Sequence, residues 1–302
     1  MNGPTDSPGG PTCGGPAEAS PGPRAAARGP CDTAGMSSSR ETYSHGHHAS
    51  VLASHARRTA QSSAAYLLPH LRPTDVVLDV GAGPGTITAD LGALVARVVG
   101  IDAAPAAVQA ARELVAARGL TNVQVEVGDV YALDAPDAAY DVVHAHQVLQ
   151  HLGDPVAALR EMRRVCRPGG LVAVRDADYA TMTWFPQSAG LDRWLTLYED
   201  LARRNGGEPD AGRRLKAWAL EAGFTDVAAS GSVWCFASAE DLAWWTQTWA
   251  ERVTASSFAT GLLEHGLTDE AALAGLAEAW RTFGADPRAW FLVPHGEVLA
   301  RA

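Results

Sequence analysis

The chain has 302 residues, 47% of them hydrophobic, and a formal net charge of -10. These values predict a folded protein of one elaborated domain or two small ones. The acidic balance offers no basic field for a phosphate backbone, so we expect no nucleic-acid partner. The chain has no apolar run long enough to span a membrane and no signal-peptide pattern, which predicts a cytoplasmic protein without a membrane partner.

The first forty residues are dominated by Gly, Pro, Ala and Ser. Such a segment cannot offset its ordering entropy by burial, so we expect a disordered extension at 1–40 before a domain at 41–302. Met36 stands where ordinary sequence resumes, and we hypothesise a natural translation start there instead of at Met1. The cysteines show no metal spacing and are expected to be free thiols. They are Cys13, Cys31, Cys166 and Cys235.

Strand and helix patterns alternate in the first half of the domain. Apolar residues at helical spacing predict one or two helices over 50–71. Short β-branched runs then predict parallel strands, and the helical patterns between them predict right-handed crossovers on both faces of the sheet. The expected strands are 75–80, 97–102, 123–130, 140–146 and 171–179, and the expected helices are 86–96, 105–119 and 154–170.

The second half of the domain has a different composition, because all nine tryptophans lie after Ala180. Its pattern still predicts regular elements. The expected helices are 191–206, 211–223 and those within 239–284, and the expected strands are one within 224–238 and one at 289–302.

The turn after the first expected strand reads GAGPG. Gly81 allows a tight turn, Gly83 lets the backbone approach a ligand, and Gly85 opens a helix whose N–H groups point into the crevice at the strand ends. A dinucleotide site has a glycine where this chain has Thr86. The shorter pattern after Asp79 favours a zwitterionic amino-acid tail beside a nucleoside, since the carboxylate balances an ammonium directly or through water.

Two further acids follow strand ends. Asp102 ends the second expected strand, where a carboxylate accepts hydrogen bonds from both hydroxyls of a ribose. Asp129 follows the third and is placed to accept a hydrogen bond from an exocyclic adenine amine. A lone GxGxG pattern is weak, and these acidic strand ends in register with it make a nucleoside site the favoured interpretation.

The stretches LDVGAGPGT, VVGID, GDV, YDVVHAHQVLQHL and LREMRRVCRPGG together resemble class I S-adenosylmethionine-dependent methyltransferases. The resemblance is to the small-molecule branch similar to ubiquinone/menaquinone-type enzymes. It implies S-adenosylmethionine as methyl donor and S-adenosylhomocysteine as product. On matching positions, it implies a donor site formed by Asp79, Gly81, Ala82, Gly83, Gly85, Asp102, Ala103, Asp129, Val130 and His146.

The same resemblance implies the fold class. We expect an α/β protein with a seven-stranded, Rossmann-like, doubly wound sheet that is mostly parallel, with its last strand antiparallel. Helices cover both faces, and a helical insertion lies between the last two strands. Residues 41–72 would form an N-terminal lid, and 181–204 with 239–285 a helical cover over the acceptor.

Methyl transfer from a sulfonium needs chiefly in-line alignment and exclusion of water. A base is needed only if the acceptor loses a proton, and the catalytic candidates are Tyr43, His47, His151 and Asp178. The lid motif YSHGHHAS adds His48 as a contact, with a metal site or a solvated loop as alternatives; we expect no metal. A structural role is the alternative for His151. Arg57 and Arg58 either hold the donor carboxylate or lie on the surface.

The tryptophans suggest the acceptor. We expect Trp184, Trp245 and Trp249, with Tyr43, to wall a pocket for a flat ring, although core packing is the alternative for each tryptophan. We therefore predict methylation of a small aromatic metabolite (indole, phenol or quinone-like) in secondary or cofactor metabolism, such as natural product biosynthesis. The alternatives are a noncatalytic nucleoside-binding protein with a partner on its tryptophan-rich half and, less favoured, an oxidoreductase. Monomer and homodimer both stay open.

Overall fold

The computed structural model describes residues 57–302. The predicted extension at 1–40, the start at Met36 and the lid residues Tyr43, His47 and His48 lie outside the described residues. Within 57–302, none of the helices combines the length and apolar character that crossing a membrane requires.

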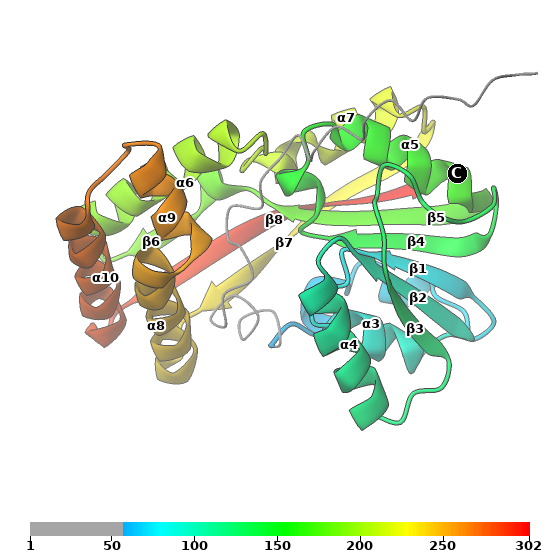
Figure 1. Ribbon diagram of the computed structural model, residues 1–302, viewed down its shortest axis with the longest axis horizontal. Coiled ribbons are helices and arrows are strands. Elements are labelled where there is room, and N and C mark those ends of the chain that lie inside the picture. Colours follow the sequence, from blue (N-terminus) through cyan, green and yellow to red (C-terminus); the bar gives the residue numbers. More distant parts are fainter. Residues whose placement is uncertain (1–56) are drawn as a thin grey trace, which may run out of the picture. The chain divides into compact units, whose positions relative to one another are not determined.

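A mostly parallel sheet organises the described chain (Figure 1). Its strands follow the order β3-β2-β1-β4-β5-β8-β6, and β7 pairs with the other edge of β8. The first five strands run parallel, and β8 is antiparallel to β5, β6 and β7. The strands are β1 (Val76–Val80), β2 (Arg97–Asp102), β3 (Val123–Val127), β4 (Tyr140–His146), β5 (Cys166–Ala177), β6 (Thr183–Phe185), β7 (Asp226–Phe236) and β8 (Trp290–Arg301).

The predicted fold class is confirmed, but the predicted strand count of seven is wrong, because the sheet has eight strands. The additional strand is β6, whose three residues pair with the first three residues of β8. A strand this short has no alternating pattern to detect in sequence. Its pairing depends instead on a partner more than a hundred residues further along the chain.

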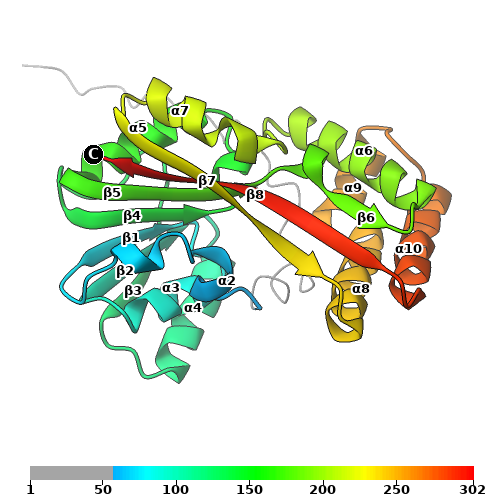
Figure 2. The same cartoon turned by 180° about the vertical axis from the view of Figure 1, so that it is seen from behind.

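Helices cover both faces of the parallel part of the sheet (Figure 2). Apolar side chains alternate along each strand, so neighbouring residues such as Val142 and Val143 enter different cores. One core is closed by α2 (Ala60–Ser63), α3 (Thr86–Gly92) and α4 (Pro105–Ala117), and the other by α5 (Pro155–Val165) and α7 (Leu215–Glu221).

The expectation of one or two helices over 50–71 can be compared with the structure only over 57–71, where the helical segments are shorter than expected. Only the single turn α2 and the 3₁₀ helix η1 (Leu68–His70) form there. Thr59 caps α2 by accepting a hydrogen bond from the Ser62 N–H, and the Ser62 hydroxyl bonds back to the Thr59 backbone. Such side chains compete with helical hydrogen bonds, and Pro69 has no N–H to continue a helix.

The helical insertion between the last two strands is confirmed as α8 (Ala239–Ala255), α9 (Ser257–Glu264) and α10 (Glu270–Ala285). Together with α6 (Ala189–Arg204), these helices surround the first residues of β8 and enclose a separate aromatic core. At its centre the Trp194 ring meets the rings of Trp249 and Trp280 edge to face, with centroids 4.5 and 4.8 Å away. Most of the tryptophans therefore fill a core.

Candidate active site

The glycine turn between β1 and α3 has a backbone that other residues rarely adopt. Gly81, Gly83 and Gly85 have φ values of +70°, +54° and +82°, all in the left-handed region. A Cβ atom on Gly81 would collide with Val148, and one on Gly85 with Ala111. Close packing and a left-handed backbone thus restrict Gly81 and Gly85 to glycine. A glycine turn of this kind directly after β1 fits the donor that the sequence implies.

Asp102 is held at this turn by backbone donors. Its Oδ2 accepts a hydrogen bond from the Gly83 N–H and its Oδ1 one from the Ala104 N–H, both at 2.9 Å. These bonds orient the carboxylate, and each oxygen keeps a further lone pair for a ligand hydroxyl. The geometry is that expected of a ribose site, with Ala103 in the same loop; the assignment of both residues stays a prediction.

The predicted adenine residues stand at the neighbouring strand end. The Gly128 N–H donates to the Asp102 backbone oxygen at 3.1 Å, which places the Gly128–Val130 loop beside the Asp102 loop. Asp129 Oδ1 accepts from the Tyr131 N–H at 2.9 Å. Val130 packs against the core beneath. The structure therefore brings these predicted donor residues to one edge of the sheet.

Asp79 lies deeper than the sequence suggests. It is buried, its Oδ2 accepts from the Thr88 hydroxyl at 2.6 Å, and its Oδ1 lies 2.7 Å from His144 Nδ1. Both carboxylate oxygens are thus engaged within the protein, and the predicted direct contact with a ligand ammonium is not favoured by this geometry. Sequence reasoning missed His144, whose only signal was its alternation with His146 along β4.

His146 lies between the donor end and the tryptophan-rich half. The side chain is buried, and neither ring nitrogen has a hydrogen-bond partner within 57–302. Its ring centre is 5.6 Å from that of Trp234 and 6.1 Å from that of His295. Burial, and next the charge of Arg58, lower the pKa of His146 well below its usual value, so the ring is neutral at neutral pH.

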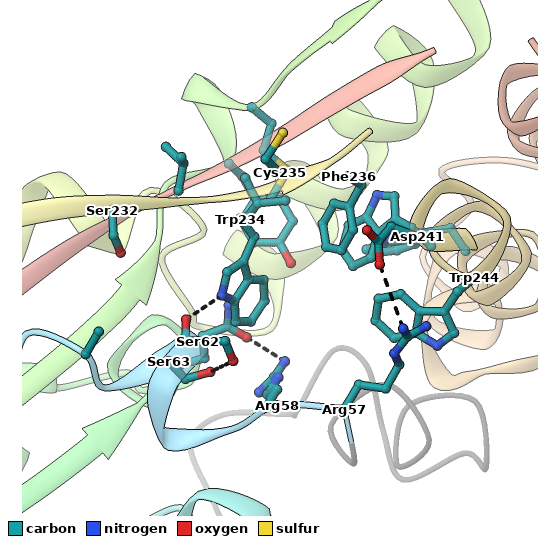
Figure 3. A pocket seen from close by; sticks show the side chains of 18 of the residues that line it. Arg57, Arg58, Ser62, Ser63, Ser232, Trp234, Cys235, Phe236, Asp241 and Trp244 are labelled. Carbon is teal, nitrogen blue, oxygen red and sulfur yellow. Dashed lines mark hydrogen bonds and ion pairs between the residues drawn. The ribbon is translucent and has the colours of Figure 1, made fainter. Parts of the chain in front are cut away.

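A cavity of about 500 Å³ lies among the segment before β1, the second half of β7, β8 and α8 (Figure 3). Gln147, directly after β4, also reaches it, so the cavity meets the carboxyl end of a parallel strand. Aromatic side chains form much of its wall. They are Tyr179, Trp234, Phe236, Trp244, Trp245 and Trp249.

The structure separates the predicted acceptor tryptophans. Trp245 and Trp249 line the cavity and also pack into the aromatic core. Trp184 is a correction, since it is absent from the wall and its ring stacks on Phe291 at 5.5 Å. The β6 strand turns Trp184 toward the core beneath the insertion helices, where it serves as packing.

The predicted bases differ in position. His151 lines the cavity, and burial lowers its pKa to about 3, which leaves a neutral ring and a weak base. Asp178 is not part of the wall. Two guanidinium nitrogens and the backbone N–H of Arg213 donate hydrogen bonds to the Asp178 carboxylate. This arrangement is typical of a structural ion pair. Both catalytic roles stay predictions that this geometry does not favour.

A polar chain runs from Arg58 in the cavity wall through Gln147 to His295. Sequence reasoning named Arg58 but missed Gln147 and His295. An Arg58 guanidinium N–H donates to Gln147 Oε1 at 2.7 Å, and Gln147 Nε2 lies 2.8 Å from His295 Nε2. His295 Nδ1 is 2.9 Å from the Val293 backbone oxygen, so Nδ1 carries the proton and Nε2 accepts from the amide. Gln147 holds a left-handed φ of +53°, a strained conformation that is common at functional sites.

Comparison with known proteins agrees with this arrangement. Residues 71–228 match the family described as a methyltransferase domain. An uncharacterised methyltransferase of Schizosaccharomyces pombe is 34% identical over 269 residues, covering 85% of this chain and 95% of that protein. A probable methyltransferase of Aspergillus luteorubrus is 34% identical over 190 residues, covering 58% of this chain and 65% of that protein.

Among solved structures, the YcgJ protein of Bacillus subtilis matches with a TM-score of 0.51 and 18% identity, covering 78% of this chain and 97% of that chain. This likeness concerns the fold. The fold is Rossmann-like, and the glycine turn and the acidic strand ends fit a nucleoside-containing donor. The chain belongs to the methyltransferase domain family and is an S-adenosylmethionine-dependent methyltransferase. The predicted enzyme class and methyl donor are confirmed.

Proposed function

We propose that the methyl acceptor is a small aromatic molecule (an indole, a phenol or a quinone-like compound) bound in the tryptophan-lined cavity. The observation that carries the proposal is the aromatic lining of this cavity. Phe236 and Trp245 stack with their ring centres 4.4 Å apart, and the half-buried rings of Trp234 and Trp244 border the same space. Flat apolar faces around a few polar groups suit an aromatic ligand.

The size and position of the cavity support the same proposal. Its volume of about 500 Å³ lies within the usual range for small-molecule sites. It meets the carboxyl end of β4, the edge of the sheet at which the glycine turn and Asp102 also lie. When bound, S-adenosylmethionine supplies an electrophilic methyl group, and the chain's own task is to orient the acceptor and exclude water.

We assign the donor to the residues that the sequence implies around Gly81–Gly85, Asp102 and Asp129. We place the reaction in secondary or cofactor metabolism, since aromatic acceptors of this size belong there. The noncatalytic alternative is not favoured, because the chain belongs to a family of methyltransferases.

A transfer assay tests the acceptor class. Purified full-length protein is incubated with S-adenosylmethionine carrying a labelled methyl group and a panel of indoles, phenols and quinones. We expect transfer to at least one class, and Trp244→Ala should lower kcat/KM for it roughly tenfold, since aromatic contacts contribute about 0.5–1.5 kcal/mol beyond area burial. The matched control is Trp290→Ala, because Trp290 is 37% exposed and does not line the cavity.

Two results would overturn the aromatic acceptor. One is transfer to aliphatic compounds alone by a protein that binds S-adenosylhomocysteine. The other is an equal loss of kcat/KM in the Trp244 and Trp290 variants, which would show that the cavity wall has no special part in the reaction.

A further inference from the structure

The cavity is richer in positive than in negative charge, although the chain as a whole carries -10. Within the described residues, its wall includes the arginines Arg57, Arg58 and Arg252 and the acids Asp241 and Glu297. Three cations therefore face two anions in a space that is otherwise largely aromatic. A local charge opposite to that of the whole protein is a feature of sites that select charged ligands.

Both acids in the wall are compensated by the protein itself. Asp241 lies 3.8 Å from the Arg57 guanidinium and accepts a hydrogen bond from the Ser238 hydroxyl at 2.7 Å (Figure 3). Glu297 accepts from the hydroxyls of Ser230 and Ser232 at 2.8 and 2.5 Å. Each acid is also paired with an arginine, Asp241 with Arg57 and Glu297 with Arg175 at 3.3 Å, so neither carboxylate is an unpaired negative charge in the cavity.

Arg175 adds a further positive charge directly behind Glu297. Its Nε lies 3.3 Å from Glu297 Oε1, while its Nη1 and Nη2 have no hydrogen-bond partner within 57–302. Arg175 is only 1% exposed, and its guanidinium lies 5.0 Å from the ring centre of the cavity residue Trp234. Burial lowers its pKa to about 10, so it remains charged at neutral pH.

Arg58 carries positive charge to the inner end of the cavity. Its guanidinium lies 5.4 Å from the Trp234 ring centre and donates a hydrogen bond to Gln147 Oε1. The amide nitrogen of Gln147 in turn donates to His295 Nε2. These two bonds fix the amide, and its nitrogen carries a second N–H beside the Arg58 guanidinium. The charge of Arg58 also contributes to the lowered pKa of His151 and of His295, which agrees with a positive field in this region.

We propose that the aromatic acceptor is an anion, such as an aromatic carboxylate or an acidic phenol, and that Arg58 and Gln147 recognise its negatively charged oxygen. The inference rests on the proposed function, since it assumes that the acceptor occupies this cavity. The rings of Trp234, Trp244 and Trp245 hold the flat part of the molecule. The guanidinium of Arg58 is the specificity determinant, because it provides both charge and directed N–H donors.

A pair of fluorescent probes tests the charge preference without turnover. Full-length protein saturated with S-adenosylhomocysteine is titrated with the anionic dye anilinonaphthalenesulfonate and with its uncharged parent phenylnaphthylamine. We expect the anionic dye to bind roughly tenfold more tightly or better, a difference of about 1.4 kcal/mol. Arg58→Gln should weaken the anionic dye by a similar factor and leave the neutral dye unchanged, and Arg58→Lys should retain part of the preference.

The matched control removes one charge elsewhere. Arg193→Gln, on the exposed side of α6, causes the same change in net charge outside the cavity and should leave both dyes unchanged. A cooperative urea-induced unfolding transition with an unchanged midpoint verifies that the Arg58 variants are folded. Displacement of the dye by 4-hydroxybenzoate and by uncharged 4-hydroxybenzamide repeats the comparison with acceptor-like molecules, and the acid should displace it at lower concentration.

The outcomes separate the two proposals. Equal affinity for the two dyes, or equal weakening of both by Arg58→Gln, would overturn the anionic acceptor and leave the aromatic cavity standing. An equal effect of Arg193→Gln on the anionic dye would also overturn it, by assigning the preference to general surface charge. Absence of binding by both dyes, together with transfer to aliphatic compounds alone, would instead overturn the aromatic acceptor.

Discussion

The donor end and the acceptor half of this methyltransferase are built in different ways. At the proposed donor end the backbone forms much of the site, because the N–H groups of Gly83 and Ala104 orient Asp102 through hydrogen bonds at 2.9 Å. In the proposed acceptor half side chains line the cavity, and rings from α8 and α10 meet Trp194 of α6 in the aromatic core beside it. A site formed by the backbone tolerates few residue types at its turn. In a site formed by side chains, amino-acid substitutions can change which ligand binds.

The largest expected effect is a loss of stability in the aromatic core. Trp194→Ala removes a fully buried ring at the centre of the aromatic core and should lower the free energy of unfolding by about 3–5 kcal/mol. Urea-induced unfolding measures the change, with exposed Trp290→Ala as the control. Where the variant is still folded, its affinity for S-adenosylhomocysteine should stay close to that of the unmodified protein. A loss of under about 1 kcal/mol would contradict the packing role.

The next effect concerns the donor end. Asp102→Ala removes a charged hydrogen-bond acceptor and should weaken S-adenosylhomocysteine by about 1.5–3 kcal/mol, roughly tenfold to a hundredfold or more in Kd. Calorimetric titration measures the affinity. Asp134→Ala is the control, because Asp134 is exposed and lies on the loop before β4. An unchanged Kd for Asp102→Ala would remove the ribose assignment.

The smallest effect is confined to acidic pH. The folded pKa of His151 is lowered to about 3, below its ordinary value, so the unfolded chain binds the proton more readily. The stability contributed by the neutral ring is therefore complete above about pH 6.5 and is lost as the pH falls toward 3. Burial lowers the pKa of His146 and of His295 in the same direction.

His151→Gln tests this sign. Urea unfolding at about pH 7.5 and about pH 5 should show a smaller loss of stability on acidification for the variant than for the unmodified protein. An equal loss in both proteins would mean that His151 is not held neutral by the fold, and the interpretation of its pKa would have to be given up.

The parallel strands and the glycine turn were predictable because their signals are local. Each of β1 to β5 contains a short β-branched run. GAGPG marks a turn with three left-handed glycines. The errors fall where long-range contacts decide. β6 exists only because β8 passes beside it, and Trp184 turns into a core formed by helices distant in sequence. One difference has a local cause instead: within 57–71, side-chain hydrogen bonds of Thr59 and Ser62 accompany a single helical turn in place of a longer helix.

By itself, the sequence determined the sheet's first five strands, the donor turn and the acid that ends β2, since φ preferences and hydrophobic periodicity act over a few residues. Only the tertiary structure decided the cavity that we propose as the acceptor site. Gln147 and His295 are 148 residues apart and meet because β8 inserts antiparallel beside β5, which itself pairs with β4, the strand before Gln147. Side-chain sites assembled by such pairing have no short motif, because no single stretch of chain contains them.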